Sequence, residues 1–207
     1  MARFNNILDG GSGKAGPLVL YKWRGLNCFR ARPESYRDKK SEAQLKQRQK
    51  MKLVHGFLRS FKEELNTTFY EGDIGRTPYQ AAISYNLKYG IGGEYPDQYI
   101  DCKTALIAKG EIPLPENIVL ERNGDSGIIS WDAAGAVKDK RRNDELFVFV
   151  LRNVNGYVER IDTYVNRSSG ICVVDQLFLD GDENVMVWAV FINKKQREVS
   201  NSVCLTC

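Results

Sequence analysis

The stretch VMVWAVFI, residues 185–192, is an uninterrupted run of eight apolar residues, most of them β-branched or aromatic. Such a run is typical of a buried β-strand, because these side chains pack well on a pleated sheet. Six further short runs of this type follow residue 113, at 118–120, 127–131, 146–151, 157–161, 171–175 and 199–205. Their spacing is close to the roughly 8–12 residues of a β-sandwich. We therefore expect an all-β sandwich over residues 113–207, with Trp131 and Trp188 in its core.

Paired prolines mark the expected start of this sandwich at Ile112-Pro113-Leu114-Pro115. Proline excludes helix and favours an extended joint between domains. The pattern upstream of this joint is different, with helical signals and only short apolar runs. The sequence thus predicts the α+β fold class in two domains, residues 1–112 and 113–207.

Two helices are expected in the first domain. Ser41 is a suitable N-cap with a capping-box glutamine three residues later, and apolar residues recur at helical spacing from there to Leu65. Thr77-Pro78 combines an N-cap with the residue preferred at the first helical position, and Gly90 ends this second helix. Short strands are expected at 99–102 and 105–108.

A small basic β-hairpin precedes the helices. Residues 19–24 have the composition of a strand, Gly25-Leu26-Asn27 that of a turn, and residues 28–32 that of the returning strand. Basic residues occupy alternate positions of each strand, so each strand is expected to present its charges on one face. Trp23 and Phe29 would then lie on the other face.

Positive charge is concentrated in the segment from residue 14 to residue 62. The chain has a net charge of +4, but this segment alone contains 14 Lys and Arg residues against Glu34, Asp38 and Glu42. A surface of this kind attracts polyanions. The candidate contact residues for assembly or for a polyanion are Lys14, Lys22, Arg24, Arg30, Arg32, Lys46, Arg48 and Lys50.

The glycines around Lys14 do not form a phosphate-binding loop. Such a loop requires G-x-x-x-x-G-K-[ST], yet Leu8 occupies the position of its first glycine and Ala15 that of its hydroxyl residue. A strand rather than a helix follows. We expect instead that these glycines let residues 10–16 turn sharply into the hairpin or run close to another backbone.

Residues for catalysis or metal binding are few. The chain has one histidine, His55, and five cysteines, an odd number that favours free thiols. Cys204 and Cys207 have the C-x-x-C spacing of half a zinc site or a redox couple, but no second pair follows. The acidic turn at 180–183 lacks the 12-residue calcium loop. We expect no catalytic residue, no metal and no cofactor.

No membrane segment or export signal is expected either. No stretch approaches about 18 apolar residues, and residues 1–6 lack the apolar core of a signal peptide. These features favour a location in the cytoplasm or in a virion.

The second half resembles a fibronectin type III-like sandwich. Ser130-Trp131-Asp132 is similar to the strand that carries the tryptophan of that family, residues 187–190 to its penultimate strand, and residues 199–202 to the start of its last strand. One departure from the family pattern is Val185, which stands near the position where the tyrosine of a tyrosine corner would be expected. The resemblance implies a fibronectin type III-like C-terminal domain.

The whole chain also resembles an uncharacterised bacterial family with a glycine-rich start, a basic hairpin, a Gln-rich helix and a closing S-N-S strand. The matching residues are Gly10, Gly11, Gly13, Lys14, Gly16, Tyr21, Lys22, Gly25, Arg30, Arg32, Pro33, Gln44, Gln47, Arg48, Phe57, Thr77, Pro78, Ala81, Ala82, Tyr85, Asn86, Ser200, Asn201 and Ser202. Such proteins are similar to some that bacteriophages and prophages encode. The resemblance implies an architecture but no activity.

Two functions are compatible with these features. The first is a non-enzymatic structural role, as a virion component or other scaffold, in which the N-terminal arm and hairpin add strands to a neighbouring subunit. The partner would be a second copy of the chain or another structural subunit. The alternative is nucleic-acid binding by residues 14–62, with Tyr21, Trp23, Phe29 and Tyr36 as stacking surfaces.

Overall fold

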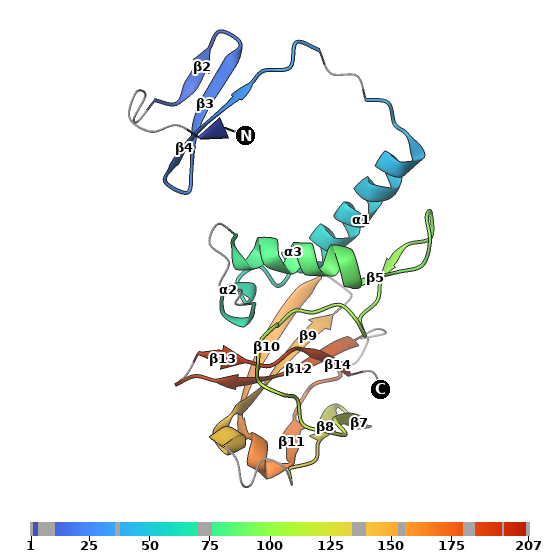
Figure 1. The fold of residues 1–207 in the computed structure, drawn as a ribbon. Coiled ribbons are helices and arrows are strands. Elements are labelled where there is room, and N and C mark those ends of the chain that lie inside the picture. The colour runs from blue at the N-terminus through green and yellow to red at the C-terminus, as the bar shows by residue number, and fades with distance from the viewer. Residues whose placement is uncertain are drawn as a thin grey trace. The chain divides into compact units, whose positions relative to one another are not determined.

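The computed structural model of the chain describes residues 2–3, 11–35, 38–69, 76–133, 140–152, 156–179, 185–195 and 197–205. The chain divides into two compact units, residues 1–44 and 45–207 (Figure 1). The α+β class is confirmed, since helices and a larger share of strands are both present. The expected boundary after residue 112 is not where the chain divides.

The first unit is a single antiparallel sheet with the strand order β1-β4-β3-β2. Its strands are β1 (Ala2–Arg3), β2 (Gly13–Ala15), β3 (Leu18–Trp23) and β4 (Leu26–Ala31). Arg24 and Gly25 connect β3 to β4, and both have positive φ, 50° and 79°. Such two-residue turns match the twist of a hairpin. The predicted three-residue turn at Gly25-Leu26-Asn27 is therefore wrong, because Gly25 is the second of two left-handed turn residues.

The second unit contains two larger sheets over the residues that the structure describes. In one, β10-β9-β12 run side by side, and β13 and β14 both pair with the far edge of β12; in the other, the order is β11-β8-β7. The strands are β7 (Val119–Asn123), β8 (Ser126–Ser130), β9 (Glu145–Arg152), β10 (Tyr157–Asn166), β11 (Ile171–Val174), β12 (Val185–Asn193), β13 (Glu198–Val199) and β14 (Val203–Leu205). Short 3-10 helices lie at Lys140–Asn143 and Arg167–Ser169. Each predicted apolar run thus falls in a strand, with a break between β13 and β14.

The two sheets pack face to face around one core. Side chains from both sheets meet there, among them Leu120 and Ile129 from the smaller sheet and Val148 and Val187 from the larger one. Trp131 follows β8 and is buried in this core, where its ring lies edge-on to Phe191. The apolar strands predicted from the sequence therefore form a two-layer β structure.

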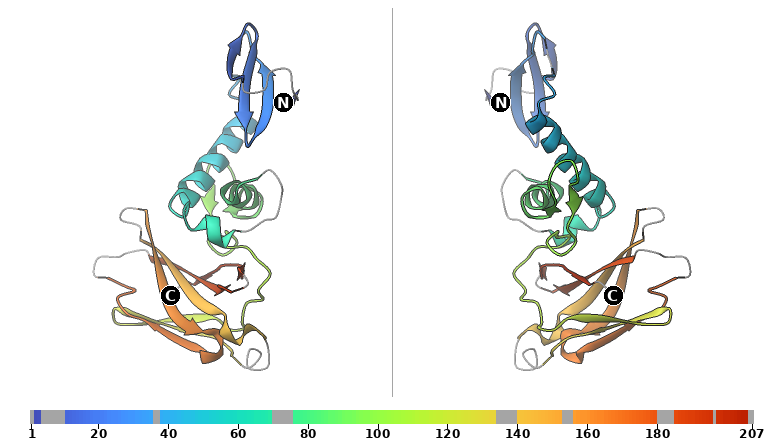
Figure 2. Two further views of the ribbon diagram at one scale, coloured as in Figure 1. Left: turned by 90° about the vertical axis from the view of Figure 1, so that its left-hand side faces the viewer. Right: turned by 90° about the vertical axis from the view of Figure 1, so that its right-hand side faces the viewer.

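A helical layer covers the other face of the larger sheet (Figure 2). It consists of α1 (Glu42–Arg59), α2 (Leu65–Thr68) and α3 (Pro78–Tyr89), followed by β5 (Ile91–Gly92) and β6 (Tyr99–Ile100). Phe57 and Phe61 pack against Trp188, which β12 presents on this face and which is fully buried. Because helices and sheet share this core, residues 45–112 are no separate domain.

The helix termini follow the predicted capping signals. Thr77 and Gln80 form a reciprocal capping box at the start of α3. Ser41 precedes α1, and its backbone N–H donates to Gln44 Oε1. The single helix expected from Ser41 to Leu65 is wrong, because α1 ends at Arg59 in a tight turn before α2 begins.

A connecting segment, residues 105–112, crosses between the helical layer and the larger sheet, and we call it the strap. It is not the strand expected at 105–108, and side chains satisfy much of its backbone. Asn86, fully buried on α3, accepts from Leu106 N–H at 2.9 Å and donates to Leu106 O at 2.9 Å. Thr68 at the end of α2 donates from Oγ1 to Ile107 O at 2.8 Å.

The break between β13 and β14 holds the strap from the opposite side. Ser202 Oγ accepts from Ile107 N–H at 3.0 Å and from Ala108 N–H at 3.4 Å. Asn201 Oδ1 accepts from Gly110 N–H at 3.2 Å, and Ser200 Oγ accepts from Phe191 N–H at 2.9 Å. The S-N-S motif therefore interrupts one strand and binds the backbone of its neighbours.

No helix among the described residues is long and apolar enough to cross a membrane.

We expect Trp131→Phe to destabilise the protein more than Trp188→Phe. Trp131 Nε1 donates to Arg167 O at 2.7 Å, whereas Trp188 Nε1 has no hydrogen-bond partner among the described residues. Both substitutions remove similar volume, but only the first leaves a buried carbonyl without its donor, a difference of about 1–3 kcal/mol. Urea unfolding of both variants measures it. Equal losses of unfolding free energy in the two variants would contradict this role of the Trp131 hydrogen bond.

We expect Ser202→Ala to cost about 1–3 kcal/mol of unfolding free energy, because it leaves two buried backbone N–H groups without an acceptor. Asn201→Ala is the matched control in the same loop, where the lost hydrogen bond is exposed. We expect that variant to stay within about 0.5 kcal/mol of the unsubstituted protein. Urea unfolding tests both, and a control as unstable as Ser202→Ala would refute this role of the serine.

Candidate functional site

The N-terminal sheet has a strongly basic surface. Lys14, Lys22, Arg24, Arg30 and Arg32 are all exposed there. No Asp or Glu occurs between residues 10 and 33. We call residues 11–33 the basic sheet.

The register of the basic sheet distributes these charges over both faces. Directly opposed residues share a face, and Val19 opposes both Lys14 and Arg30. This row lies on the same face as Trp23. Lys22 lies on the other face, together with Phe29. The expectation that Trp23 and Phe29 share a face is therefore wrong.

The turn length explains the difference. A three-residue turn would pair Lys22 with Arg30, whereas the two-residue turn pairs Lys22 with Asn27. The partner of Lys22 thus moves by three residues, and a shift by an odd number moves every side chain of the second strand to the opposite face.

The basic sheet buries few side chains. Among residues 11–35 only Cys28 is buried, and Leu18 and Leu26 are exposed. β2 is an edge strand, paired with β3 on one side only within the described residues. A small sheet needs a hydrophobic face or packing against another element to be stable in water, so apolar surface supplied from elsewhere would stabilise this one.

The remaining predicted contact residues lie on α1, in the second unit. Lys46 and Arg48 are exposed and Lys50 is half-buried. Gln49, which lies between Arg48 and Lys50 in the sequence, donates from Nε2 to Pro96 O at 2.5 Å. The eight predicted residues are thus divided between the two units rather than gathered on one element.

A second surface, which the sequence reasoning missed, is the outer face of the smaller sheet. Cross-strand pairing places Val119 in one row with Ile171, and Ile128 in a second row with Val173. Ile171 and Val173 keep 54% and 59% of their surface exposed. Contiguous exposed apolar side chains of this kind mark interaction sites.

Acidic side chains flank these apolar residues. Glu121 lies in the row of Ile128 and is exposed. Asp175, just beyond β11, accepts a hydrogen bond from Ser126 Oγ at 3.2 Å. We call Val119, Glu121, Ile128, Ile171, Val173 and Asp175 the acid-flanked face. In the sequence, this face is indicated by residues 171–174, which are all apolar. A strand that is apolar at every position presents apolar side chains on both faces of its sheet.

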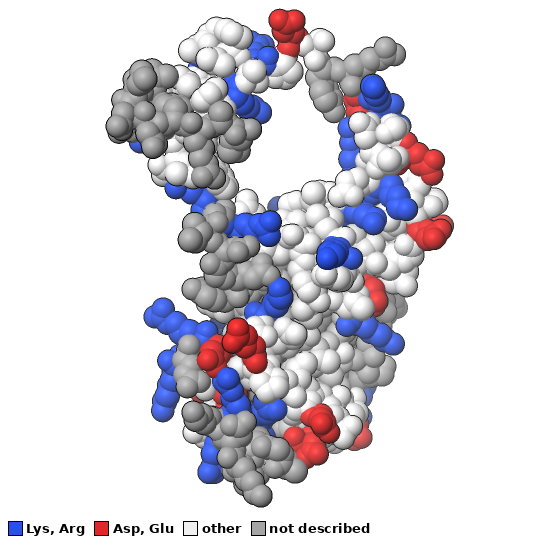
Figure 3. All heavy atoms as spheres, viewed as in Figure 1, with Lys and Arg blue, Asp and Glu red and all other residues white. Residues whose placement is uncertain are grey.

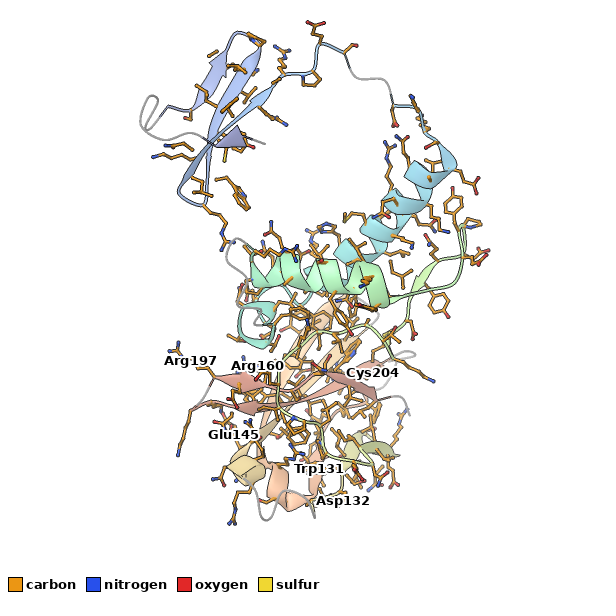
Figure 4. The ribbon with its side chains drawn as sticks, in the orientation of Figure 1. Trp131, Asp132, Glu145, Arg160, Arg197 and Cys204 are labelled. Atoms are coloured by element: carbon orange, nitrogen blue, oxygen red, sulfur yellow. The ribbon has the colours of Figure 1, made fainter. Side chains whose placement is uncertain are left out.

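A cavity of about 830 Å³ lies between the end of α1 and the start of β10. Its lining residues are Arg59, Ser60, Lys62, Glu63, Glu64, Gly156, Tyr157, Val158 and Arg160. Arg160 (Figure 4) pairs with Asp162 at 2.7 Å and with Glu64 at 3.1 Å. The guanidinium lowers the pKa of Asp162 mainly through this hydrogen bond. The charge of Arg160 is thus compensated.

Charges elsewhere on the second unit are mixed. On the face shown in Figure 3, acidic and basic side chains are interspersed over the second unit. Lys194 pairs with Glu145 at 2.6 Å and also lies over the ring of Phe147. His55 lies at the surface, 3.4 Å from the hydroxyl of Tyr79. Within the described ranges, no three His, Cys, Asp or Glu side chains gather as a metal site.

Several residues considered in the sequence lie outside the described residues. They are Tyr36, the acidic turn at 180–183, and Cys207 of the C-x-x-C pair. Trp131 and Trp188, predicted for the core of one sandwich, lie in two different cores on opposite faces of the larger sheet.

The chain belongs to the family of unknown function DUF6266, which it matches over residues 10–206. This match confirms the expected membership of an uncharacterised family over nearly the whole chain. No curated protein matches the chain.

We expect Asp162→Asn to lower the melting temperature at neutral pH but to have little effect in acid. The pKa of Asp162 in the folded protein lies below its ordinary value of 3.8, so the ion pair contributes fully above that pH. The contribution is lost as the pH falls through the lower folded-state value. Melting curves at successive pH values test this, with the exposed Glu94→Gln as control. A difference in melting temperature between Asp162→Asn and the unsubstituted protein that persists unchanged in strong acid would refute this role of the ion pair.

Proposed function

We propose that the protein is a non-enzymatic structural component that assembles head to tail, with the basic sheet of one copy bound to the acid-flanked face of the next. The observation that carries this proposal is the complementarity of the two surfaces. One has five exposed cations and no carboxylate between residues 10 and 33, and the other has Glu121 and Asp175 beside exposed apolar side chains.

Exposed apolar side chains also support contact between these two surfaces. The basic sheet leaves Leu18 and Leu26 exposed, and the acid-flanked face leaves Ile171 and Val173 exposed. Contact between the two surfaces removes apolar area from water on both sides, while the opposite charges orient the encounter. Because two different surfaces meet, the contact is heterologous and generates a ring or a filament.

The two-layer β structure suits a spacing module of such an assembly, and we infer that it is fibronectin type III-like. In a sandwich of the immunoglobulin constant type, the fourth of the seven strands lies in the same sheet as the first, second and fifth strands. Counted from β7, the fourth strand of this chain is β10, which lies in the other sheet and pairs with β9. The fold therefore differs from the constant type in the placement of this strand. The resemblance to phage and prophage proteins makes a virion the proposed setting.

Light scattering of complementary variants tests the assembly. The chain without residues 1–40 lacks the basic sheet but keeps both cores of the second unit, so we expect it to fold as a monomer. Val173→Lys adds a cation to the acid-flanked face at an exposed position and should also be monomeric. Tyr157→Lys, exposed on the other sheet, is the control and should assemble like the unsubstituted chain.

Mixing the two monomeric variants gives the sharpest result. Each keeps the surface that the other lacks, so we expect a heterodimer of one copy of each, which cannot grow further. A full-length chain that is monomeric, or a mixture in which both variants stay monomeric, would contradict the proposal.

Nucleic-acid binding is the second candidate function. Lys14 and Arg30 lie on the same face of the basic sheet as Trp23 and Tyr21, the combination of cations and rings that binds single strands. The basic sheet also leaves Leu18 and Leu26 exposed, and exposed apolar side chains favour a protein partner. A monomer that binds DNA at low salt and releases it at high salt would support this alternative.

A further inference from the structure

Three sulfur atoms from distant parts of the chain meet at one edge of the larger sheet. Cys102 Sγ lies 3.2 Å from Met186 Sδ and donates to it. Cys204 lies close enough to Cys102 to lower the pKa of its thiol. Cys102 is therefore near both of the other side chains.

Backbone register explains why these side chains meet. Cys204 on β14 (Figure 4) opposes Trp188 on β12, so Met186 occupies the diagonal position on the same face. Cys102 lies in the turn after β6. Asp101 shapes this turn by accepting from Lys103 N–H and Thr104 Oγ1, and its own N–H donates to Gly90 O. The position of Cys102 is thus set by the hydrogen bonds of its neighbour Asp101.

The electrostatics of the pair favour one thiolate near neutral pH. The hydrogen bond from Cys204 lowers the pKa of Cys102 to about 7, against opposing effects of burial and of Asp101. The same hydrogen bond raises the pKa of Cys204, and Lys103 acts in the opposite direction.

The surroundings select a soft metal ion. Cys102, Met186 and Cys204 are each half-buried and pack against an apolar core that includes Ile107 and Trp188. Soft thiolate and thioether ligands select Cu(I), zinc or iron–sulfur clusters, and Cu(I) is the one of these that accepts a thioether in a three-ligand sulfur site. Structural zinc instead takes four ligands, and a thioether is not among its usual ones.

We propose that Cys102, Met186 and Cys204 form a binding site for Cu(I), with two thiolates and one thioether as ligands. Binding releases whichever thiol protons the two cysteines still carry and involves no change in oxidation state. The site is independent of the assembly surfaces, since none of its residues belongs to the basic sheet or to the acid-flanked face.

Anaerobic titration of the reduced full-length protein with Cu(I), in competition with the chelator bicinchoninate, tests the site. We expect one bound ion per chain. Cys102→Ser and Cys204→Ser should each lower the affinity by about a hundredfold or more, and Met186→Leu by about tenfold. The matched controls are Met51→Leu, an exposed methionine on α1, and Cys172→Ala, a buried cysteine in the other core. Both should bind like the unsubstituted protein.

Cys207 lies outside the described residues, so Cys207→Ser is included to separate the C-x-x-C pair from the proposed site. We expect this variant to keep its affinity. Absence of Cu(I) binding by the reduced protein would overturn the proposal. So would undiminished binding by Met186→Leu, or loss of binding in Cys207→Ser. Circular dichroism confirms that each variant is folded, so a lost site is distinguished from a lost fold.

Discussion

The second unit depends on the side-chain hydrogen bonds that hold the strap between the helical layer and the larger sheet. Backbone buried without partners is costly, and residues 106–110 lie in no strand that would supply them. Asn86 on one side and Ser202 on the other provide donors and acceptors in their place. Both side chains are themselves buried. Removing either side chain leaves buried backbone groups of the strap without a hydrogen bond, which destabilises the folded state.

This arrangement also explains why the helices are not a separate domain. The strap joins them to the sheet at the break between β13 and β14, and Phe57 and Phe61 pack on Trp188 just beside it. The paired prolines at 113 and 115 follow the strap rather than a domain. An extended joint and a domain boundary give the same local sequence signal, so composition alone could not distinguish them.

Local patterns predicted most elements of the fold, and long-range contacts account for the differences. The apolar runs coincide with strands and the Thr77-Pro78 cap with α3, because these signals act within a few residues. Which side chains share a face of the basic sheet could not be predicted in the same way. A change of one residue in the length of the turn between β3 and β4 moves the side chains of β4 to the opposite face. The acid-flanked face and the three sulfur atoms depend on the pairing of strands that are distant in the sequence.

The two surfaces proposed for assembly differ in how visible they are in the sequence. The cations of the basic sheet form a compositional cluster, whereas Glu121 and Asp175 become neighbours of Ile128 and Val173 only through the register of β7, β8 and β11. One surface of each type on every copy is what a repeating head-to-tail contact requires. The basic sheet, which buries only one of the residues described between 11 and 35, would gain stability from that contact.

Zero-length carbodiimide cross-linking of a mixture of isotopically labelled and unlabelled chains tests this contact most directly. The reagent joins amines to carboxylates that touch, and mass spectrometry then reports whether both halves of a linked peptide come from one copy or from two. The account predicts links between different copies that join Lys14 or Lys22 to Glu121 or Asp175. Links confined to single copies, or links between copies that avoid the acid-flanked face, would contradict it.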